Sequence, residues 1–323
     1  MESYRGDLID LIEHDAVAQE SINDVVDLSK VKPNSSAWIA FINNLFLWIG
    51  FIALGLSVIF FLAHNWSQIG RFAKFAIVET GLILSILVYL KTQNGSVTSS
   101  ASLTVSSILL GALMALFGQT YQTGADPWQL FFNWAILMTP WAIIARFTTI
   151  WVVWLSLLNL SIVLYCDAHT NPLSILFGTK ISVLWPLFIF NTVTFIVWYR
   201  LSQSLLWMQK QWAIRLIAIG VGVSITSLAL FSILDDRTID ILALPVWALF
   251  IFSLYFFYRK LQIDLFMLAG GCLSGIVIVV SFFGKEVLSQ GESIAYLMLS
   301  IIVIGMGVGA ALWLKKVQAE AQT

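Results

Sequence analysis

The chain has 323 residues, of which 59% are hydrophobic and only 11% are charged. Soluble domains carry about 25% charged residues, so this composition excludes a water-soluble fold for most of the chain. The formal net charge of −1 and the absence of a basic stripe argue against nucleic acid as a partner.

The first 35 residues are acidic and form a separate segment. They hold eight of the 18 carboxylate side chains, which are Glu2, Asp7, Asp10, Glu13, Asp15, Glu20, Asp24 and Asp27. Apolar residues such as Tyr4, Leu8 and Leu11 recur there at helical spacing, which predicts short amphipathic helices on the cytoplasmic side of the bilayer. The segment is either a small solvated cap or a surface that docks a protein partner.

Residues 36–323 form the predicted transmembrane domain. They contain ten apolar runs long enough to cross a lipid bilayer, which takes about 20 residues. The runs lie near residues 40–63, 72–90, 101–118, 128–145, 148–166, 181–199, 213–234, 239–258, 263–283 and 294–314. This pattern predicts an all-α fold: a polytopic membrane helix bundle of about ten transmembrane helices.

The placement of lysine and arginine predicts the orientation of these spans. With the N-terminus inside, and counting from Lys30 onward, eleven basic residues fall on the cytoplasmic side and five on the outer side. An excess of Lys and Arg in short cytoplasmic loops is the general rule for membrane proteins. We therefore expect a multi-pass protein of the inner (cytoplasmic) membrane with both termini in the cytoplasm.

Four of the polar side chains inside predicted spans are candidates for function. Glu79 lies about 10 Å from the outer end of the second span at 1.5 Å per residue. A carboxylate at that depth faces the bundle interior or water, so Glu79 either pairs with another helix or belongs to a transport or proton pathway. Asn133, Asn159 and Asn191 fall in the fourth, fifth and sixth spans, where each forms either an interhelical hydrogen bond or part of a binding site.

A polar hairpin, Gly118–Gln129, connects the third and fourth spans. Asp126 and Pro127 suit the cap and the first position of a helix, so the Asp126 carboxylate is expected to cap the fourth span. The stretch before them has five hydrogen-bonding side chains in a row, which are Gln119, Thr120, Tyr121, Gln122 and Thr123. Such a stretch costs free energy at membrane depth unless protein or water satisfies it, which indicates a loop or re-entrant segment beside a polar cavity.

The first half of the chain resembles a known family over about residues 1–165. Two stretches carry the resemblance: Phe61-Leu-Ala-His-Asn-Trp66 and Gly118-Gln-Thr-Tyr-Gln-Thr-Gly-Ala-Asp-Pro-Trp-Gln-Leu-Phe-Phe-Asn-Trp134. Together with the acidic N-terminal segment, they are similar to the bacterial predicted membrane protein family known as domain of unknown function 2157. The resemblance implies a multi-span inner-membrane protein and brings no activity with it.

These features predict a transporter-like protein for a small solute or a lipid, with a polar pocket in its outer half. The predicted pocket consists of Glu79, Gln119, Thr120, Tyr121, Gln122, Thr123, Asp126, Asn133, Asn159 and Asn191. The alternative is a non-catalytic membrane scaffold or envelope-stress partner that docks through its N-terminal helices.

An enzymatic function is the interpretation that the sequence favours least. The common catalytic motifs are absent, and no outer loop is long enough to build a catalytic face. The two cysteines, Cys166 and Cys272, exclude a disulfide framework, and no Cys/His spacing suggests zinc. We therefore expect no catalytic residue, no metal site and no cofactor.

Overall fold

The computed structural model describes residues 35–93, 95–169, 179–235, 240–290 and 293–321, together with residues 11 and 25. The acidic segment predicted over residues 1–35 therefore lies almost entirely outside the described residues. Its amphipathic helices and its docking surface stay predictions.

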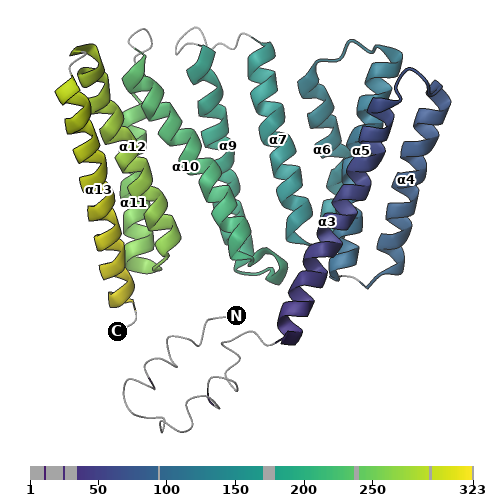
Figure 1. Ribbon diagram of the computed structural model, residues 1–323, viewed down its shortest axis with the longest axis horizontal. Helices are drawn as coiled ribbons and strands as arrows, with labels where there is room; N and C mark the ends of the chain where they lie inside the picture. Colours follow the sequence, from purple (N-terminus) through teal and green to yellow (C-terminus); the bar gives the residue numbers. More distant parts are fainter. Residues whose placement is uncertain are drawn as a thin grey trace. The chain divides into compact units, whose positions relative to one another are not determined.

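The described part of the chain is α-helical, and ten of its helices are long and apolar enough to cross a membrane. The helices are α3 (Ser35–His64), α4 (Arg71–Lys91), α5 (Val97–Tyr121), α6 (Pro127–Ala145), α7 (Thr148–Ala168), α9 (Thr179–Ser202), α10 (Gln211–Leu234), α11 (Ala243–Phe256), α12 (Leu265–Gln290) and α13 (Ser293–Glu320) (Figure 1). A π-helical turn, η3 (Phe257–Leu261), continues α11, and a short 3₁₀-helix, η2 (Leu206–Met208), lies between α9 and α10. The predicted all-α bundle is thus confirmed for the described residues.

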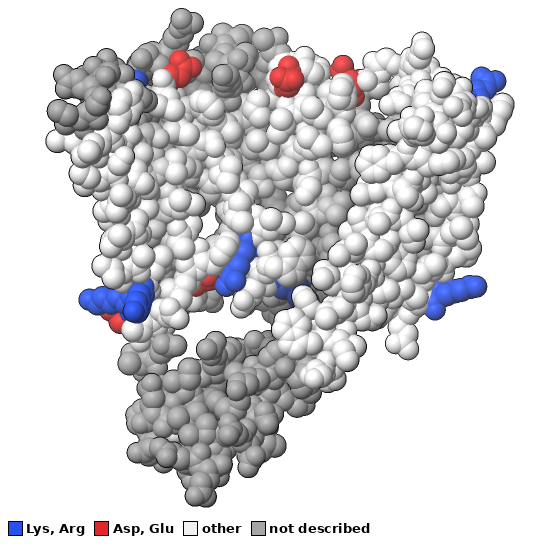
Figure 2. All heavy atoms as spheres, viewed as in Figure 1, with Lys and Arg blue, Asp and Glu red and all other residues white. Residues whose placement is uncertain are grey.

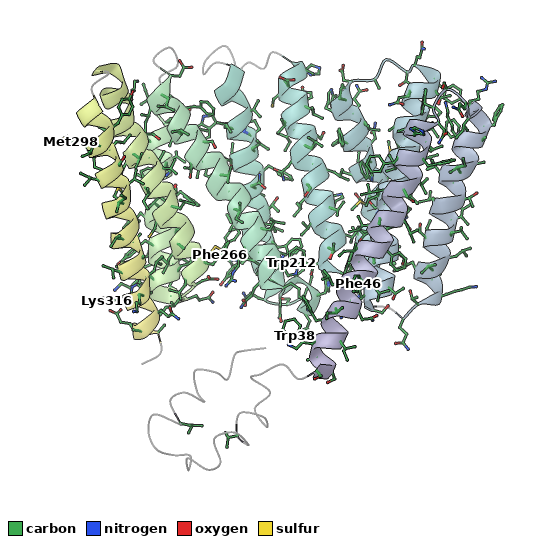
Figure 3. All side chains as sticks on the ribbon, in the orientation of Figure 1. Trp38, Phe46, Trp212, Phe266, Met298 and Lys316 are labelled. Carbon is green, nitrogen blue, oxygen red and sulfur yellow. The ribbon has the colours of Figure 1, made fainter. Side chains whose placement is uncertain are left out.

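Large apolar side chains cover the outside of the helices. Phe46 on α3 is 66% exposed and Met298 on α13 is 61% exposed (Figure 3). Soluble monomers rarely expose contiguous apolar patches of more than a few hundred Å², so a surface of this kind needs lipid as its solvent. The chain is therefore a membrane protein.

Two helix boundaries are set by polar turns. Arg146 adopts a left-handed conformation with φ of 49° after α6, which separates α6 from α7. The eighth run was expected from residue 239, whereas α11 begins at Ala243. Asp240 precedes it, and its Oδ1 accepts a hydrogen bond from the Leu242 backbone N–H at 3.0 Å. This local turn competes with helix formation and delays the start of α11.

The described helices fall into two compact units, which we treat separately. Unit 1 ends at Ala112 and contains α3, α4 and the first part of α5. Unit 2 runs from Leu113 to Ala321 and contains the rest of α5 and the helices α6 to α13.

Unit 1 is held together by small and hydroxylated residues. The hydroxyl oxygens of Ser85 on α4 and Ser106 on α5 share a hydrogen bond at 2.7 Å. Helices α3 and α5 approach closely at Gly55, where a Cβ atom would lie 3.0 Å from Val105 Cγ1. Membrane helices associate through such contacts because lipid gives them no hydrophobic driving force.

Helix α10 is central to the packing of unit 2. It contacts α9, α11 and α12, while α6 packs on α7, α7 on α9, and α12 on α13. Consecutive helices of the unit run in alternating directions, so their connections gather at two ends (Figure 1).

The two ends of unit 2 differ in charge. The end that holds the C-terminus carries the basic residues Arg146, Arg200, Lys210, Arg215, Arg259, Lys260, Lys315 and Lys316 (Figure 2). Two carboxylates at this end, Asp264 and Glu320, form ion pairs with Arg215 and Arg259. At the opposite end, the charged residues whose side chains are described are Asp126, Asp167, Asp235, Asp240 and Lys285. Among the described residues, one end of unit 2 is therefore basic and the other acidic.

Candidate functional site

Two residues of the predicted polar pocket contact each other. The Asn191 side-chain Nδ2 donates a hydrogen bond to Asn159 Oδ1 at 2.6 Å, which joins α9 to α7. Each amide also donates within its own helix, Asn191 to Leu187 O and Asn159 to Leu155 O, both at 2.9 Å. Asn191 is only 7% exposed. These contacts support an interhelical hydrogen-bonding role for both asparagines.

Asn133, in the same unit, makes no hydrogen bond with this pair, and Glu79 belongs to unit 1. Asn133 on α6 is exposed, and Glu79 on α4, in unit 1, is exposed as well. Among the described residues Glu79 makes no hydrogen bond or ion pair. Lys74 is buried instead, with its Nζ 3.6 Å from the centroid of the Trp66 ring, which is a cation–π contact. A functional role for Glu79 stays a prediction.

The polar stretch between α5 and α6 is partly helical. Helix α5 continues through Tyr121, so Gln119 and Thr120 belong to the helix and residues 122–126 alone form the connection. The loop prediction is therefore wrong for these three residues, because the helix extends beyond the apolar run. Residues 118–129 are all described and form the end of α5, a short connection and the start of α6, while a re-entrant position in the bilayer stays a prediction.

Two residues of the polar stretch, Gln122 and Thr123, end α5 through their backbone. Gln122 adopts φ of 46°, in the left-handed region. The Thr123 backbone N–H donates to Gly118 O at 3.3 Å. Together they form the Schellman arrangement that ends many helices, with glutamine in the position that glycine usually takes.

The expected Asp126 cap is only half correct. Asp126 occupies the N-cap position of α6 and Pro127 is its first residue, but the Asp126 carboxylate makes no capping hydrogen bond. The Gln129 backbone N–H donates to the Asp126 backbone carbonyl at 3.0 Å instead. Because the main chain satisfies this donor, the carboxylate is not needed for it.

An apolar opening lies elsewhere in unit 2, between α9, α10, α11 and α12. This apolar groove has a volume of about 860 Å³. It is lined by Thr192, Phe195, Ala218, Ile219, Val221, Gly222, Val223, Thr226, Ser227, Leu230, Phe250, Ser253, Leu254, Phe257, Tyr258, Phe266, Met267, Ala269, Gly270, Leu273, Ser274 and Val277. None of these residues was predicted as a site from the sequence.

Glycines leave the groove open. A Cβ atom added at Gly222 or Gly270 would meet no other atom within 4 Å. The neighbouring helix glycines behave differently, since a Cβ at Gly220 would lie 2.9 Å from Asn191 Oδ1 and one at Gly271 would lie 3.0 Å from a Leu254 methyl carbon. Gly220 and Gly271 therefore serve helix packing, whereas Gly222 and Gly270 border free space.

A small polar cluster lies within the apolar lining. The hydroxyl oxygens of Thr226 and Ser274 share a hydrogen bond at 2.6 Å, and Trp247 Nε1 donates to Ser274 Oγ at 2.9 Å. The Thr192 hydroxyl also lines the groove, and it is buried with no partner among the described residues. The groove thus offers a long apolar surface in which the Thr192 hydroxyl is buried without a partner among the described residues.

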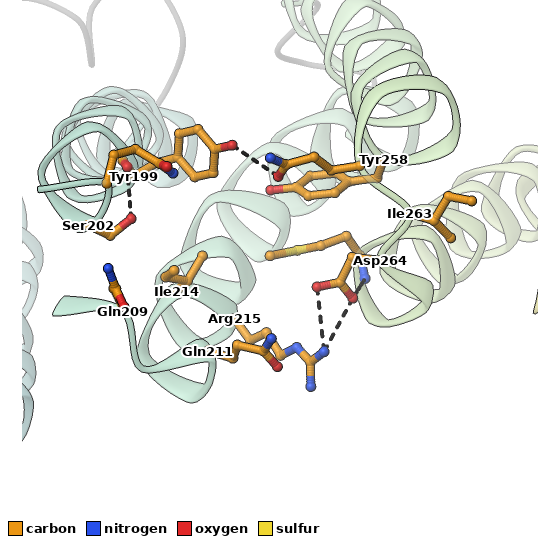
Figure 4. A pocket seen from close by; sticks show the side chains of 12 residues that line it. Tyr199, Ser202, Gln209, Gln211, Ile214, Arg215, Tyr258, Ile263 and Asp264 are labelled. Atoms are coloured by element: carbon orange, nitrogen blue, oxygen red, sulfur yellow. Dashed lines mark hydrogen bonds and ion pairs between the residues drawn. The ribbon is translucent and has the colours of Figure 1, made fainter. Parts of the chain in front are cut away.

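A second, polar cavity of about 360 Å³ adjoins the groove (Figure 4). It is lined by Tyr199, Ser202, Gln203, Gln209, Gln211, Ile214, Arg215, Tyr258, Gln262, Ile263, Asp264 and Met267. Tyr258 and Met267 line both cavities, so the two cavities are adjacent. Figure 4 shows Arg215 facing Asp264 across the lower part of this cavity, with Tyr199 donating to Gln262 Oε1 at 3.0 Å above it.

The two charged groups of the polar cavity are held from different helices. Arg215 lies in the first turns of α10, and its Nη2 is 3.4 Å from Asp264 Oδ1. Asp264 precedes α12, where its Oδ1 accepts the Phe266 backbone N–H at 2.9 Å and so caps the helix. The Arg215 guanidinium carbon lies 5.1 Å from the Phe266 ring centroid. Arg215 Nε is buried and has no partner among the described residues.

A π-helical turn forms the boundary between groove and cavity. In η3 the Gln262 backbone N–H donates to Phe257 O at 3.0 Å, five residues back. This wider turn places Phe257 on the groove and Tyr258 on both spaces. Single π-helical turns occur frequently at functional sites.

Two features of the sequence point to this site, although the sequence analysis did not assign a site to them. Arg215 falls inside the seventh predicted span, residues 213–234, and an ionisable residue at such a position is a functional hypothesis by default. Asp264 directly precedes an apolar run, which is typical of a helix cap. The hydrophobic periodicity of the sequence could not show that Arg215 and Asp264 contact each other.

Together the fold and the two cavities define a polytopic α-helical membrane protein with an apolar groove that adjoins a polar cavity. Residues 11–151 match the family described as predicted membrane protein (DUF2157), which confirms the resemblance for that part of the chain. No curated protein and no solved structure matches the chain. The family match ends before the residues that line the groove, so it carries no information about the site.

Proposed function

We propose that the protein is a transporter-like membrane protein that binds an amphipathic lipid, with an acyl chain in the apolar groove. The observation that carries this proposal is the open, apolar volume of about 860 Å³ bordered by Gly222 and Gly270. Its size falls within the range of about 300–1,000 Å³ that is typical of ligand pockets.

The length of the groove fits one leaflet of a bilayer. Along α10 the lining extends from Ala218 to Leu230, which corresponds to about 18 Å at 1.5 Å per residue. Half of the hydrocarbon core of a bilayer is about 15 Å thick. A single acyl chain can therefore lie along α10 and α12 within the groove.

The groove is accessible from the side. Ile219, Val223 and Leu273 line it and are 46%, 59% and 63% exposed. Since these rim residues are apolar, a lipid can enter from the bilayer without removing polar groups from water.

Filling the groove tests this function. Gly270→Leu places a side chain in the free space, and Gly275→Leu is the matched control, because it lies on the same helix, also has no neighbour within 4 Å, and does not line the groove. Native mass spectrometry of the delipidated protein with added dioleoyl lipids should show lipid adducts for wild type and Gly275→Leu and weaker adducts for Gly270→Leu. Equal adducts in all three would overturn the proposal.

Movement of the lipid is tested separately in proteoliposomes. Leaflet exchange of a fluorescent lipid should be faster with wild type than with Gly270→Leu.

The charge difference between the ends of unit 2 supports our further proposal that the protein lies in the inner membrane with both termini in the cytoplasm.

A further inference from the structure

We propose that the polar cavity binds the anionic head group of the lipid whose chain lies in the groove, with Arg215 as the binding residue. This inference rests on the proposed lipid-binding function. It assigns the class of ligand: an amphiphile that carries a phosphate or carboxylate group.

Arg215 has hydrogen-bonding capacity to spare. Its Nη2 approaches the two Asp264 oxygens at 3.4 and 3.5 Å, which is long for a charge-assisted hydrogen bond. Its Nε is buried without a partner among the described residues. A guanidinium has five N–H donors in a planar fork that suits phosphate and carboxylate oxygens. The side chain can therefore accept an anion while it keeps its contact with Asp264.

The Asp264 carboxylate is shared between Arg215 and the start of α12. Its Oδ1 already accepts the Phe266 N–H at 2.9 Å and the Met267 N–H at 3.5 Å, so α12 draws on the same carboxylate. These are the two charged side chains that line the cavity, and the remaining polar lining is neutral. Gln209 and Gln211 can donate to the oxygens of a bound head group.

The depth of the two cavities fits an amphiphile. Arg215 is four residues from the start of α10 at Gln211, which corresponds to about 6 Å along the helix axis. Arg215 therefore lies near one end of this span, whereas the groove continues from Ala218 towards the middle of the helix. Tyr258 and Met267 line both spaces, so a head group in the polar cavity and an acyl chain in the groove would be neighbours.

The test compares lipids that share their chains and differ in head group. Binding of dioleoyl phosphatidic acid and dioleoylglycerol is measured by native mass spectrometry, with inorganic phosphate alone as a further ligand. Wild type should prefer phosphatidic acid. Arg215→Gln should weaken phosphatidic acid binding by roughly tenfold to a hundredfold and leave dioleoylglycerol unchanged, because a hydrogen bond to a charged group is lost.

Two further variants keep the test decisive. Asp264→Asn retains a residue that caps α12 and removes the repelling charge, so it should tighten phosphatidic acid binding by about threefold to tenfold. Arg259→Gln is the matched control, because it removes a basic residue that pairs with Glu320 at the same end of unit 2 but lines neither cavity. It should change neither lipid.

The outcomes separate this inference from the proposed function. If Gly270→Leu weakens both lipids while Arg215→Gln spares the preference for phosphatidic acid, lipid binding stands and the head-group site is wrong. If inorganic phosphate binds in an Arg215-dependent manner as tightly as phosphatidic acid, the cavity is a free-anion site, which also overturns the inference. If Gly270→Leu changes neither lipid, the proposed function itself fails.

Discussion

Arg215 and Asp264 face each other at 3.4 Å across the junction between α10 and α12, with side chains that are 37% and 26% exposed. An ion pair this long and this open to solvent contributes about 0–1 kcal/mol to stability. The firm interactions of Asp264 are those with the backbone of α12. The arginine is therefore available for binding, while the aspartate has a structural role of its own.

The cap formed by Asp264 predicts different effects for two substitutions. Asp264→Ala should lower the free energy of unfolding by about 1 kcal/mol, because the Phe266 N–H loses its acceptor. Asp264→Asn should cost little, since asparagine caps a helix as well as aspartate does. Thermal unfolding in detergent measures both, and equal losses would show that charge rather than capping matters.

The left-handed conformation of Gln122 predicts a stabilising substitution. Gln122→Gly should raise the stability by up to about 1 kcal/mol, because glycine adopts φ of 46° without the strain that a Cβ atom brings. Gln119→Gly, inside α5, should instead cost about 1 kcal/mol. If both variants destabilise in the same assay, the Schellman end of α5 is not formed as described.

The close approach of α9 and α10 predicts a contrast between two glycines. Gly220→Ala should destabilise by about 1–3 kcal/mol, because its Cβ would lie 2.9 Å from Asn191 Oδ1 and the amide is held by Asn159 and Leu187. Gly222→Ala should be neutral or slightly stabilising, because it faces open space and alanine favours helix. Unfolding by heat distinguishes the pair, and a harmless Gly220→Ala would contradict the Asn159–Asn191 contact.

The hydroxyl of Ser274 predicts the cost of removing a polar cluster. Ser274→Ala should lower stability by about 1 kcal/mol, because Trp247 Nε1 and the Thr226 hydroxyl both lose a partner. Ser253→Ala is the control, since Ser253 lines the same groove without a side-chain hydrogen bond among the described residues. A comparable loss in both variants would argue against the cluster.

Glu79 gives a prediction about water access. If it borders an aqueous pathway, a cysteine at this position should react with a membrane-impermeant thiol reagent, in a background where both native cysteines are replaced by serine. A cysteine at Leu84, which lies on the same helix and is 57% exposed, should stay unreactive because it faces lipid. An unreactive cysteine at position 79 would remove Glu79 from any transport pathway.

The number and type of elements could be predicted because lipid imposes a simple rule. Each run of about 20 apolar residues is expected to form a helix, since a helix satisfies its own backbone hydrogen bonds in hydrocarbon and the strands of a closed β-barrel are only about half as long. Helix ends such as Tyr121 and Ala243 could not be placed from hydropathy, because capping and turn hydrogen bonds determine them. The predicted resemblance to the family is confirmed over residues 11–151.

The candidate site could not be predicted from the sequence, and the reason is physical. Asn159 and Asn191 were predicted as site residues because they are polar residues in apolar runs, and in the structure their side chains are hydrogen-bonded to each other. The groove, by contrast, is made of ordinary apolar residues and of two glycines that differ from their neighbours only in what they face. Helix rotation and packing decide which glycine meets Asn191 and which meets free space.

Photo-crosslinking with a phosphatidic acid analogue that carries a diazirine in its acyl chain tests the central claim most directly. Mass spectrometric mapping should place the crosslinks in the groove segments 218–230 of α10 and 266–277 of α12, and Gly270→Leu should abolish them. Crosslinks spread equally over outward residues such as Phe46 and Met298, and unchanged in Gly270→Leu, would contradict the account.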